Sequence, residues 1–407
     1  MATKKDNHKC CLCNTPAAQV KGKLIEGVSG MVCKVCVEKC AQIYASQEVA
    51  KAAPVKLDKV PTPKEIKEFL DQYVVGQDHS KKVLAVAVHN HYSRLFRPDL
   101  PKGHHLKDIE LSKSNVLLIG PTGSGKTLLA QTLAKLVKVP FAMADATTLT
   151  AFGYVGSDVD SMLLSLYKNA NCDMAKTEMG IIYIDEIDKS RKPAEESLSI
   201  TRDVSGADVQ AALLKLIEGT ISEVPANGGR KHPQGENISI NTKNILFICG
   251  GAFVGLDKII ARRVKGNGVI GYGQDPATSH HKVSAKVEPE DLIKYGMLPE
   301  LVGRIPIISK LEDLDESDLL RILVEPKDAI LKQYEKMIAM DGAKLSFHED
   351  AKREIARIAL VRGTGARGLR AVVEEIMLDV MFNLKAGDDI VITSQLISEI
   401  ISGGKAA

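Results

Sequence analysis

Short apolar runs alternate with helix-like segments through the middle of the chain. Residues 116–119, 181–184 and 244–249 form such runs and predict buried strands of a parallel sheet. Between the second and third runs, residues 208–218 place their apolar side chains on one helical face, and Gly219 stands where such a helix would end. This alternation predicts an α/β domain.

The pattern changes after residue 311, where helical spacing dominates. Helices are expected around residues 325–340, 348–360 and 368–384, with short strands at residues 344–347 and 389–393. We interpret this region as a second, smaller and mainly helical domain.

Charge and composition narrow the possible classes of protein. The 407 residues include 54 Lys and Arg against 51 Asp and Glu, so no whole-protein field favours nucleic acid or a membrane surface. The N-terminal sequence MATKKDNHKC has no apolar run after its lysines, and no stretch approaches 18 apolar residues. We therefore expect neither a secretory signal nor a membrane span, and a cytoplasmic location in which clustered cysteines bind metal.

Residues 120–127, with the sequence GPTGSGKT, match the phosphate-binding pattern G-x-x-x-x-G-K-[ST] between a predicted strand and a predicted helix. The backbone N–H groups of such a loop turn toward phosphate oxygens, and the helix N-terminus adds positive potential. Lys126 is expected to reach the β and γ phosphates of ATP, and Thr127 to bind Mg²⁺. The alternative, a glycine-rich turn, does not explain the flanking strand and helix. The predicted ATP contacts are Gly120, Pro121, Thr122, Gly123, Ser124, Gly125, Lys126, Thr127 and Leu128.

The acidic pair Asp185-Glu186 ends the second apolar strand, 59 residues after Lys126. Beside a phosphate-binding loop, Asp185 can hold Mg²⁺ through water, and Glu186 can polarise an attacking water as the catalytic base. Such a pair can also serve solvation alone, but the phosphate-binding loop favours hydrolysis. Arg304 and Arg367 are further candidates for catalysis, since a guanidinium at the γ-phosphate speeds hydrolysis. Taken alone, each could be an ordinary surface arginine.

The N-terminal cysteines have the spacing of a metal site. Cys10-x-x-Cys13 and Cys33-x-x-Cys36 are separated by nineteen residues, and two such pairs close a tetrahedral Zn²⁺ site. Neutral thiols packed as small hydrophobes are the alternative. In so short a segment the metal would replace a missing core, so we predict a structural zinc.

These features give a domain plan. We predict a zinc-binding module at residues 1–50, a Pro/Lys/Ala linker at residues 51–63, a large ATPase domain at residues 64–311 and a small domain at residues 312–407.

The chain as a whole resembles the ClpX family of AAA+ ATPases. The resemblance is carried by the phosphate-binding loop, the Asp185-Glu186 pair, the N-terminal cysteines and residues 153–156, 230–232 and 365–367. It implies a bacterial homohexamer that hydrolyses ATP between subunits, unfolds tagged proteins, feeds them to the ClpP peptidase, and acts as a chaperone without ClpP. It also implies that Arg304 reaches a neighbour's nucleotide and that Arg367 is the second sensor of phosphate state. Val74 and Val75 would lie near the adenine.

The resemblance further implies a substrate pore. Tyr154 and Val155, between two glycines, would line the axial pore and grip the polypeptide, although a tight surface turn is the simpler alternative. Arg230, Lys231 and His232 would ring the pore entrance, unless they belong to an ordinary solvated loop. Residues 199–205 fall where the family has a second pore loop.

Partner contacts follow in the same way. Ile270, Gly271 and Tyr272 stand where the family docks onto ClpP through Ile-Gly-Phe, and the zinc module would pair with itself and receive adaptors and substrates. One feature departs from the wider superfamily. The third apolar strand ends Ile248-Cys249-Gly250-Gly251, so no polar first sensor can be named there.

Two other classes of function remain open from sequence. An AAA+ ATPase that acts on nucleic acid could carry a zinc ribbon, but residues 1–50 have seven Lys, four acidic residues and only Tyr44 as an aromatic. A nucleotide-gated scaffold that does no pulling is the second. No nucleic acid or membrane partner is expected, and peptide cleavage is expected to come from a partner, since neither G-x-S-x-G nor H-E-x-x-H occurs.

Overall fold

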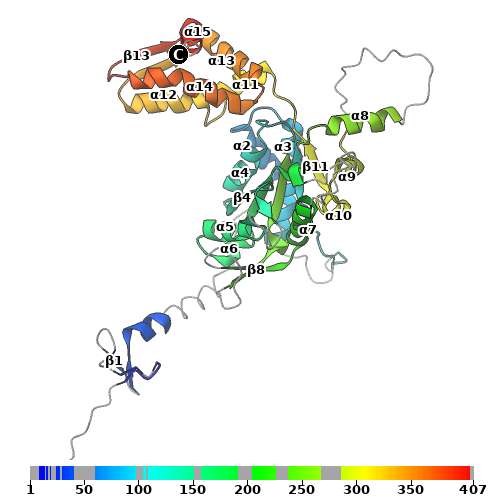
Figure 1. Ribbon diagram of the computed structural model, residues 1–407, viewed down its shortest axis with the longest axis vertical. Helices are drawn as coiled ribbons and strands as arrows, with labels where there is room; N and C mark the ends of the chain where they lie inside the picture. The colour runs from blue at the N-terminus through cyan, green and yellow to red at the C-terminus, as the bar shows by residue number, and fades with distance from the viewer. Residues whose placement is uncertain are drawn as a thin grey trace, which may run out of the picture. The chain divides into compact units, whose positions relative to one another are not determined.

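The structure is a computed structural model in which the chain forms two compact units, Met1–Lys56 and Leu57–Ala407 (Figure 1). The residues that it describes are 9–13, 15, 16, 19, 24–27, 30–40, 60–97, 104–106, 109–150, 157–190, 204–225, 237–266 and 286–403. No helix in these parts of the chain combines the length and the apolar character needed to cross a membrane.

The first unit is a small knuckle of strands and one helix. Strands β1 (Ile25–Gly27) and β2 (Gly30–Val32) pair in antiparallel register, and residues 34–40 form a helix directly after them. Cys10 forms a parallel bridge to Met31, so the first cysteine pair is fixed beside the hairpin that leads into the second pair.

A parallel sheet organises the second unit, as the sequence predicts, but it has five strands, and β4 and β11 were not among the predicted ones. Its strand order is β11-β3-β10-β7-β4, and every neighbouring pair is parallel. The strands are β3 (Val116–Ile119), β4 (Phe141–Asp145), β7 (Ile181–Asp185), β10 (Leu246–Gly251) and β11 (Ile307–Lys310).

The start of β10 corrects the predicted strand at residues 244–249. Asn241 caps a short 3-10 turn, η3 (Thr242–Asn244), with its side chain, so the extended strand begins only at Leu246. The strand continues to Gly251, which pairs with Ile119 at the entrance of the phosphate-binding loop.

Helices cover both faces of the sheet because alternate strand residues point to opposite sides. Val116 and Leu118 pack under helices α2 (Pro63–Asp71), α3 (Asp78–Phe96) and α4 (Lys126–Val137). Leu117 and Ile119 pack on the other side. The helices on that side are α5 (Ser161–Asn169), α7 (Val204–Glu218), α8 (Leu256–Gly266), α9 (Pro289–Tyr295) and α10 (Pro299–Gly303). Helix α7 starts four residues before the predicted helix 208–218.

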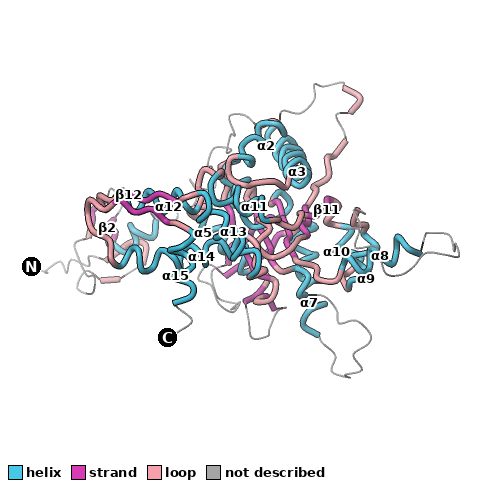
Figure 2. Tube along the Cα trace, turned by 90° about the horizontal axis from the view of Figure 1, so that it is seen from above, coloured by secondary structure: helices cyan, strands magenta, loops and turns pink. Residues whose placement is uncertain are grey.

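Smaller elements border this sheet. They are β5 (Leu149–Thr150), β6 (Ser157–Asp158), α6 (Met174–Thr177), the 3-10 turn η2 (Ile187–Ser190), and the antiparallel pair β8 (Ile221–Pro225) and β9 (Asn237–Asn241). Helices α8, α9 and α10 lie together beside β11 (Figures 1 and 2).

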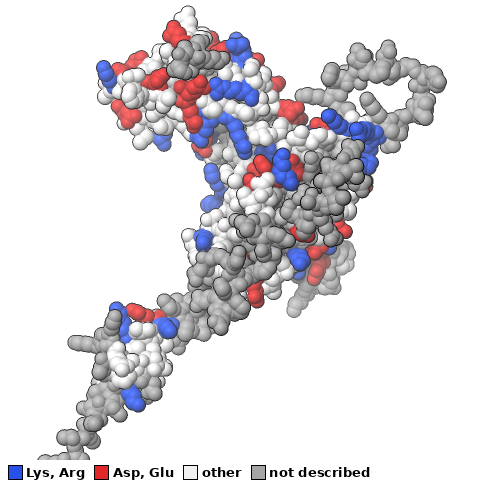
Figure 3. Space-filling view, viewed as in Figure 1, with Lys and Arg blue, Asp and Glu red and all other residues white. Residues whose placement is uncertain are grey.

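The C-terminal part has its own core, as expected for a small, mainly helical domain. Its helices are α11 (Glu316–Val324), α12 (Ile330–Met340), α13 (Glu349–Val361), α14 (Ala366–Phe382) and α15 (Ser394–Gly403), and its strands β12 (Lys344–Phe347) and β13 (Asp389–Ile392) pair in parallel. Basic and acidic side chains are interspersed over its visible face (Figure 3).

The predicted helix at residues 325–340 is wrong at its start. The chain forms two helices there, since α11 ends at Val324 and α12 begins at Ile330. Pro326 lies between them, and proline lacks the N–H that a helix interior needs. Helix α11 itself was not predicted, although Asp315 caps its first turn by accepting the N–H of Asp318.

Candidate nucleotide site and cysteine cluster

The phosphate-binding loop connects β3 to α4 at the carboxyl edge of the sheet. Lys126 is only 8% exposed, and its Nζ donates to the carbonyl oxygens of Gly120, at 2.7 Å, and Pro121, at 2.9 Å. Burial lowers the pKa of Lys126, while the charges of Asp185 and Asp188 act in the opposite direction. A desolvated ammonium held inside a loop at a helix N-terminus is well placed to bind phosphate oxygens.

Asp185 brings the end of β7 to this loop. The hydroxyl of Thr127 donates to Asp185 Oδ2 at 3.3 Å, although the two residues lie 58 positions apart. Hydroxyl and carboxylate oxygens are hard ligands of the kind that Mg²⁺ prefers. Thr127 and Asp185 therefore fit the predicted metal position by chemistry and by proximity.

Glu186 leaves the strand conformation directly after Asp185. Its backbone has a left-handed φ of 53°, and its N–H donates to Asp185 Oδ1 at 3.0 Å. Because Glu186 is no longer part of the strand, its exposed side chain is not confined to the face opposite Asp185. A non-glycine residue in this conformation is often found at functional sites.

The segment that contains Val74 and Val75 lies against the loop. Both side chains are buried, and a Cβ at Gly125 would lie 3.8 Å from Val74 Cγ1. Lys81 holds this segment in place, because its buried Nζ donates to Val74 O at 2.5 Å and to Asp71 Oδ1 at 2.7 Å. Lys81 was not among the predicted site residues, although it lies on the same helical stripe as the apolar positions of α3.

Gln77 ties the same segment to the start of the small domain. Its amide donates to Glu312 O and accepts from Glu312 N, both at 2.9 Å. In addition, the N–H of Lys327 donates to Gln72 O at 2.8 Å. These bonds join residues more than 200 positions apart, and no local sequence pattern indicated them.

The small domain closes over the phosphate-binding loop from the other side. The N–H of Ala366 donates to Gly123 O at 3.3 Å, and a Cβ on Gly123 would lie 2.5 Å from Thr364 O, so only glycine fits. A cavity of about 140 Å³ lies here. It is lined by Pro121, Thr122, Gly123, Ser124, Asp313, Leu314, Leu319, Leu360, Gly363 and Gly365. Arg367 follows on α14, and its charge is close enough to help lower the pKa of Lys126.

Arg304 lies away from this constellation. Asn115, which precedes β3, donates its amide to Arg304 O at 2.8 Å, so Arg304 sits at the amino edge of the sheet. The phosphate-binding loop follows β3 at the carboxyl edge, four strand residues or roughly 13 Å further along. The exposed guanidinium of Arg304 instead pairs with Glu218, with Nε 2.8 Å from Oε1.

The predicted pore and docking residues stay predictions. Tyr154, Val155, Arg230, Lys231, His232, Ile270, Gly271 and Tyr272 lie outside the described residues, as do residues 199–203 of the second pore loop.

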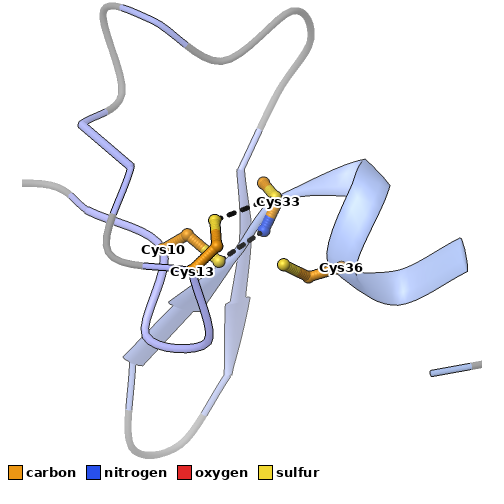
Figure 4. Close-up of side chains that lie close together, drawn as sticks. All are labelled: Cys10, Cys13, Cys33 and Cys36. Carbon is orange, nitrogen blue, oxygen red and sulfur yellow. Dashed lines mark hydrogen bonds between the residues drawn. The ribbon is translucent and has the colours of Figure 1, made fainter. Parts of the chain in front are cut away.

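Four cysteines converge in the first unit. The Sγ atoms of Cys10, Cys13, Cys33 and Cys36 all lie within 4.8 Å of one another (Figure 4). Cys13 Sγ and Cys33 Sγ are 3.7 Å apart, close to the roughly 3.8 Å edge of a tetrahedron with Zn–S bonds of about 2.3 Å.

The electrostatics of the cluster also suit a cation. Backbone N–H groups of Cys13 and Cys33 donate to the Cys10 thiol and lower its pKa to about 6. Cys36 shows the opposite trend, because the neighbouring sulfur atoms of Cys33 and Cys13 raise its pKa. Four thiolates this close repel one another unless a positive ion lies between them, so the residues present fit Zn²⁺.

Comparison with known proteins agrees with this architecture. A family model described as an AAA domain of the Cdc48 subfamily matches residues 111–308, and a model of the C-terminal D2-small domain of ClpB matches residues 314–396. A Treponema denticola protein, the ATP-dependent Clp protease ATP-binding subunit ClpX, is 49% identical over 405 residues. The match covers 97% of this chain and 95% of that protein.

Proposed function

This chain belongs to the ClpX family of AAA+ ATPases, and from this premise we propose that it uses ATP hydrolysis to unfold tagged proteins and feed them to the ClpP peptidase. It is an ATPase subunit of the Clp protease type. The observation that carries the proposal is the meeting of Lys126, Thr127 and the Asp185-Glu186 pair at one edge of the sheet, within a chain that matches a ClpX along almost its whole length.

Each residue of the site has a proposed role in hydrolysis. Lys126 binds the β and γ phosphates, and Thr127 and Asp185 hold Mg²⁺, which neutralises charge on the phosphate oxygens when bound. Glu186 orients the attacking water and takes its proton. Val74 and Val75 provide an apolar contact for the adenine, next to Gly125.

The small domain supplies the proposed link from chemistry to motion. Gly365 and Ala366 touch the phosphate-binding loop through backbone atoms, and Arg367 is the next residue. If the Arg367 guanidinium binds the γ-phosphate of ATP and loses this contact after hydrolysis, the position of α14 relative to the phosphate-binding loop would change. We propose that the resulting movement drives the aromatic loop at Tyr154 along the substrate, which requires a ring of six subunits.

Replacing Glu186 by Gln tests the assignment of the base. Gln keeps the size of the side chain but cannot accept the proton, so ATP turnover should fall by about 10²–10⁴-fold. Binding of a fluorescent ATP analogue should stay unchanged, because Lys126 and the loop remain. Steady-state ATPase rates and nucleotide titrations measure the two effects.

Glu335→Gln is the matched control. Glu335 is exposed on α12, away from the site, and its replacement should leave turnover unchanged. Turnover by Glu186→Gln close to the unchanged protein would remove Glu186 from the role of base.

The unfolding function itself is tested with a stably folded fluorescent protein that carries a degradation tag. With ATP alone, fluorescence should fall without cleavage, and with ClpP added the protein should be degraded. Tyr154→Ala should slow both processes while ATP hydrolysis continues. Hydrolysis without any loss of fluorescence would support the scaffold alternative, and hydrolysis stimulated by DNA would support the nucleic-acid alternative.

The proposed partners follow from the same family membership. The subunits form a homohexamer, the loop containing Ile270, Gly271 and Tyr272 docks onto ClpP, and the zinc module receives adaptors and substrates. The position of Arg304 supports a ring, because this arginine is remote from the phosphate-binding loop of its own chain. Its guanidinium is exposed, and we propose that it exchanges its ion pair with Glu218 for the nucleotide of a neighbour.

A further inference from the structure

A buried tyrosine hydroxyl reaches the metal-binding edge of the sheet. Tyr183 lies on β7, two residues before Asp185, so both side chains point to the α4 face of the sheet. Its ring is fully buried, and its hydroxyl donates to Asp185 Oδ1 at 3.1 Å. This is the polar end of an otherwise apolar core residue.

The neighbouring strand is built to leave room for this hydroxyl. Ile248 of β10 pairs with Tyr183, and Gly250 follows two residues later. A Cβ at Gly250 would overlap the hydroxyl oxygen of Tyr183, so no other residue fits there. Gly250 is therefore the residue that gives the end of β10 no polar side chain, and it is also the residue that makes room for the Tyr183 hydroxyl.

The two oxygens of Asp185 have different surroundings. Oδ1 accepts from two donors, the Tyr183 hydroxyl at 3.1 Å and the N–H of Glu186 at 3.0 Å. Oδ2 accepts from the Thr127 hydroxyl at 3.3 Å. One oxygen is thus held by protein groups on both sides, while the other faces the residue expected to bind Mg²⁺.

We propose that Tyr183 is a positioning residue for the metal-facing carboxylate: its hydroxyl fixes Asp185 Oδ1 so that Oδ2 stays aimed at Thr127 and Mg²⁺. This inference rests on the proposed Mg²⁺ site at Thr127 and Asp185. Partners that orient a ligating carboxylate commonly change metal affinity by tenfold or more when removed.

Tyr183→Phe tests the inference, because it removes one oxygen and keeps the buried ring. Mn²⁺ is used in place of Mg²⁺, and its Kd is measured on the protein–ADP complex, with protein in excess over ADP. The concentration of free Mn²⁺ is read from its electron paramagnetic resonance signal. We expect this Kd to rise about tenfold. Binding of fluorescent ADP in EDTA should not change, since no metal takes part.

Tyr92→Phe is the matched control. Tyr92 is also fully buried, and its hydroxyl donates to Met179 O at 3.1 Å, near the opposite end of β7. This variant loses a comparable buried hydrogen bond and should keep the Mn²⁺ affinity of the unchanged protein.

The outcomes separate the inference from the site on which it rests. If Tyr183→Phe keeps the Mn²⁺ affinity, or weakens ADP binding in EDTA by the same factor, Tyr183 does not position the carboxylate. If the unchanged protein shows no Mn²⁺ binding with ADP, the proposed metal site fails instead. If Tyr92→Phe loses Mn²⁺ affinity to the same extent, the effect is one of general packing and the inference is overturned.

Discussion

Replacing Arg304 by Ala is expected to slow ATP hydrolysis by about a thousandfold, while ATP binding persists. A guanidinium supplied to the γ-phosphate stabilises charge in the transition state, and its loss costs about 10³–10⁵ in rate. The cost to the folded subunit should be small, because the ion pair with Glu218 is exposed on both sides and contributes little. Turnover rates and titration with a fluorescent nucleotide measure the two effects.

Mixing variants shows which subunit the arginine serves. Lys126→Ala removes nucleotide binding but keeps Arg304, whereas Arg304→Ala keeps the phosphate-binding loop. If the arginine acts on a neighbouring subunit, a mixture of the two inactive proteins should regain part of the activity, since some interfaces then contain both groups. No recovery in mixed rings would place the action of Arg304 within its own chain.

Glu218→Gln provides the control for this experiment. It releases Arg304 from its partner at 2.8 Å without removing the guanidinium. Hydrolysis should remain close to that of the unchanged protein. A loss as large as that of Arg304→Ala would mean that the ion pair, and not the arginine at a phosphate, is what hydrolysis requires.

The three central strands of the sheet were predictable because they are defined by local composition, whereas the edge strands β4 and β11 were not predicted. Residues 116–119 and 181–184 are apolar on both faces, as a parallel strand between helix layers must be. The start of β10 was less predictable, since Ile245 is as apolar as the strand that follows it. The Asn241 side chain caps a turn at residues 242–244, and this turn competes with strand pairing, so the strand begins later than predicted.

The placement of the candidate site residues was predictable where a motif fixes both residue type and spacing. Thr127 of the loop and Asp185 at the end of β7 lie side by side, because parallel strands bring their carboxyl ends to one edge. Lys81 and Tyr183 were not predicted, because no motif fixes their residue type or spacing. Each acts through a single long side chain whose target, Val74 O or Asp185 Oδ1, depends on the packing of two elements.

Loss of one cysteine ligand is expected to unfold the first unit. Structural Zn²⁺ contributes about 10–16 kcal/mol of apparent binding energy, far more than so small a unit gains from burial. In Cys13→Ser we therefore expect bound zinc to be lost and residues 1–56 to become sensitive to limited proteolysis. Basal ATP hydrolysis should remain, because Lys126 and Glu186 belong to the separate second unit.

Cys11→Ser is the matched control, since Cys11 is exposed, lies in the same turn and is absent from the group of four converging thiols. It should retain zinc, measured by release to a chelating dye, and should resist protease like the unchanged chain. The two variants can be compared directly, because each loses one sulfur atom from the same turn. If Cys13→Ser kept its metal and its protease resistance, or if Cys11→Ser lost both, the four cysteines would not be the ligands of a structural zinc. The proximity of their sulfur atoms would then reflect only the packing of thiols beside the β1–β2 hairpin.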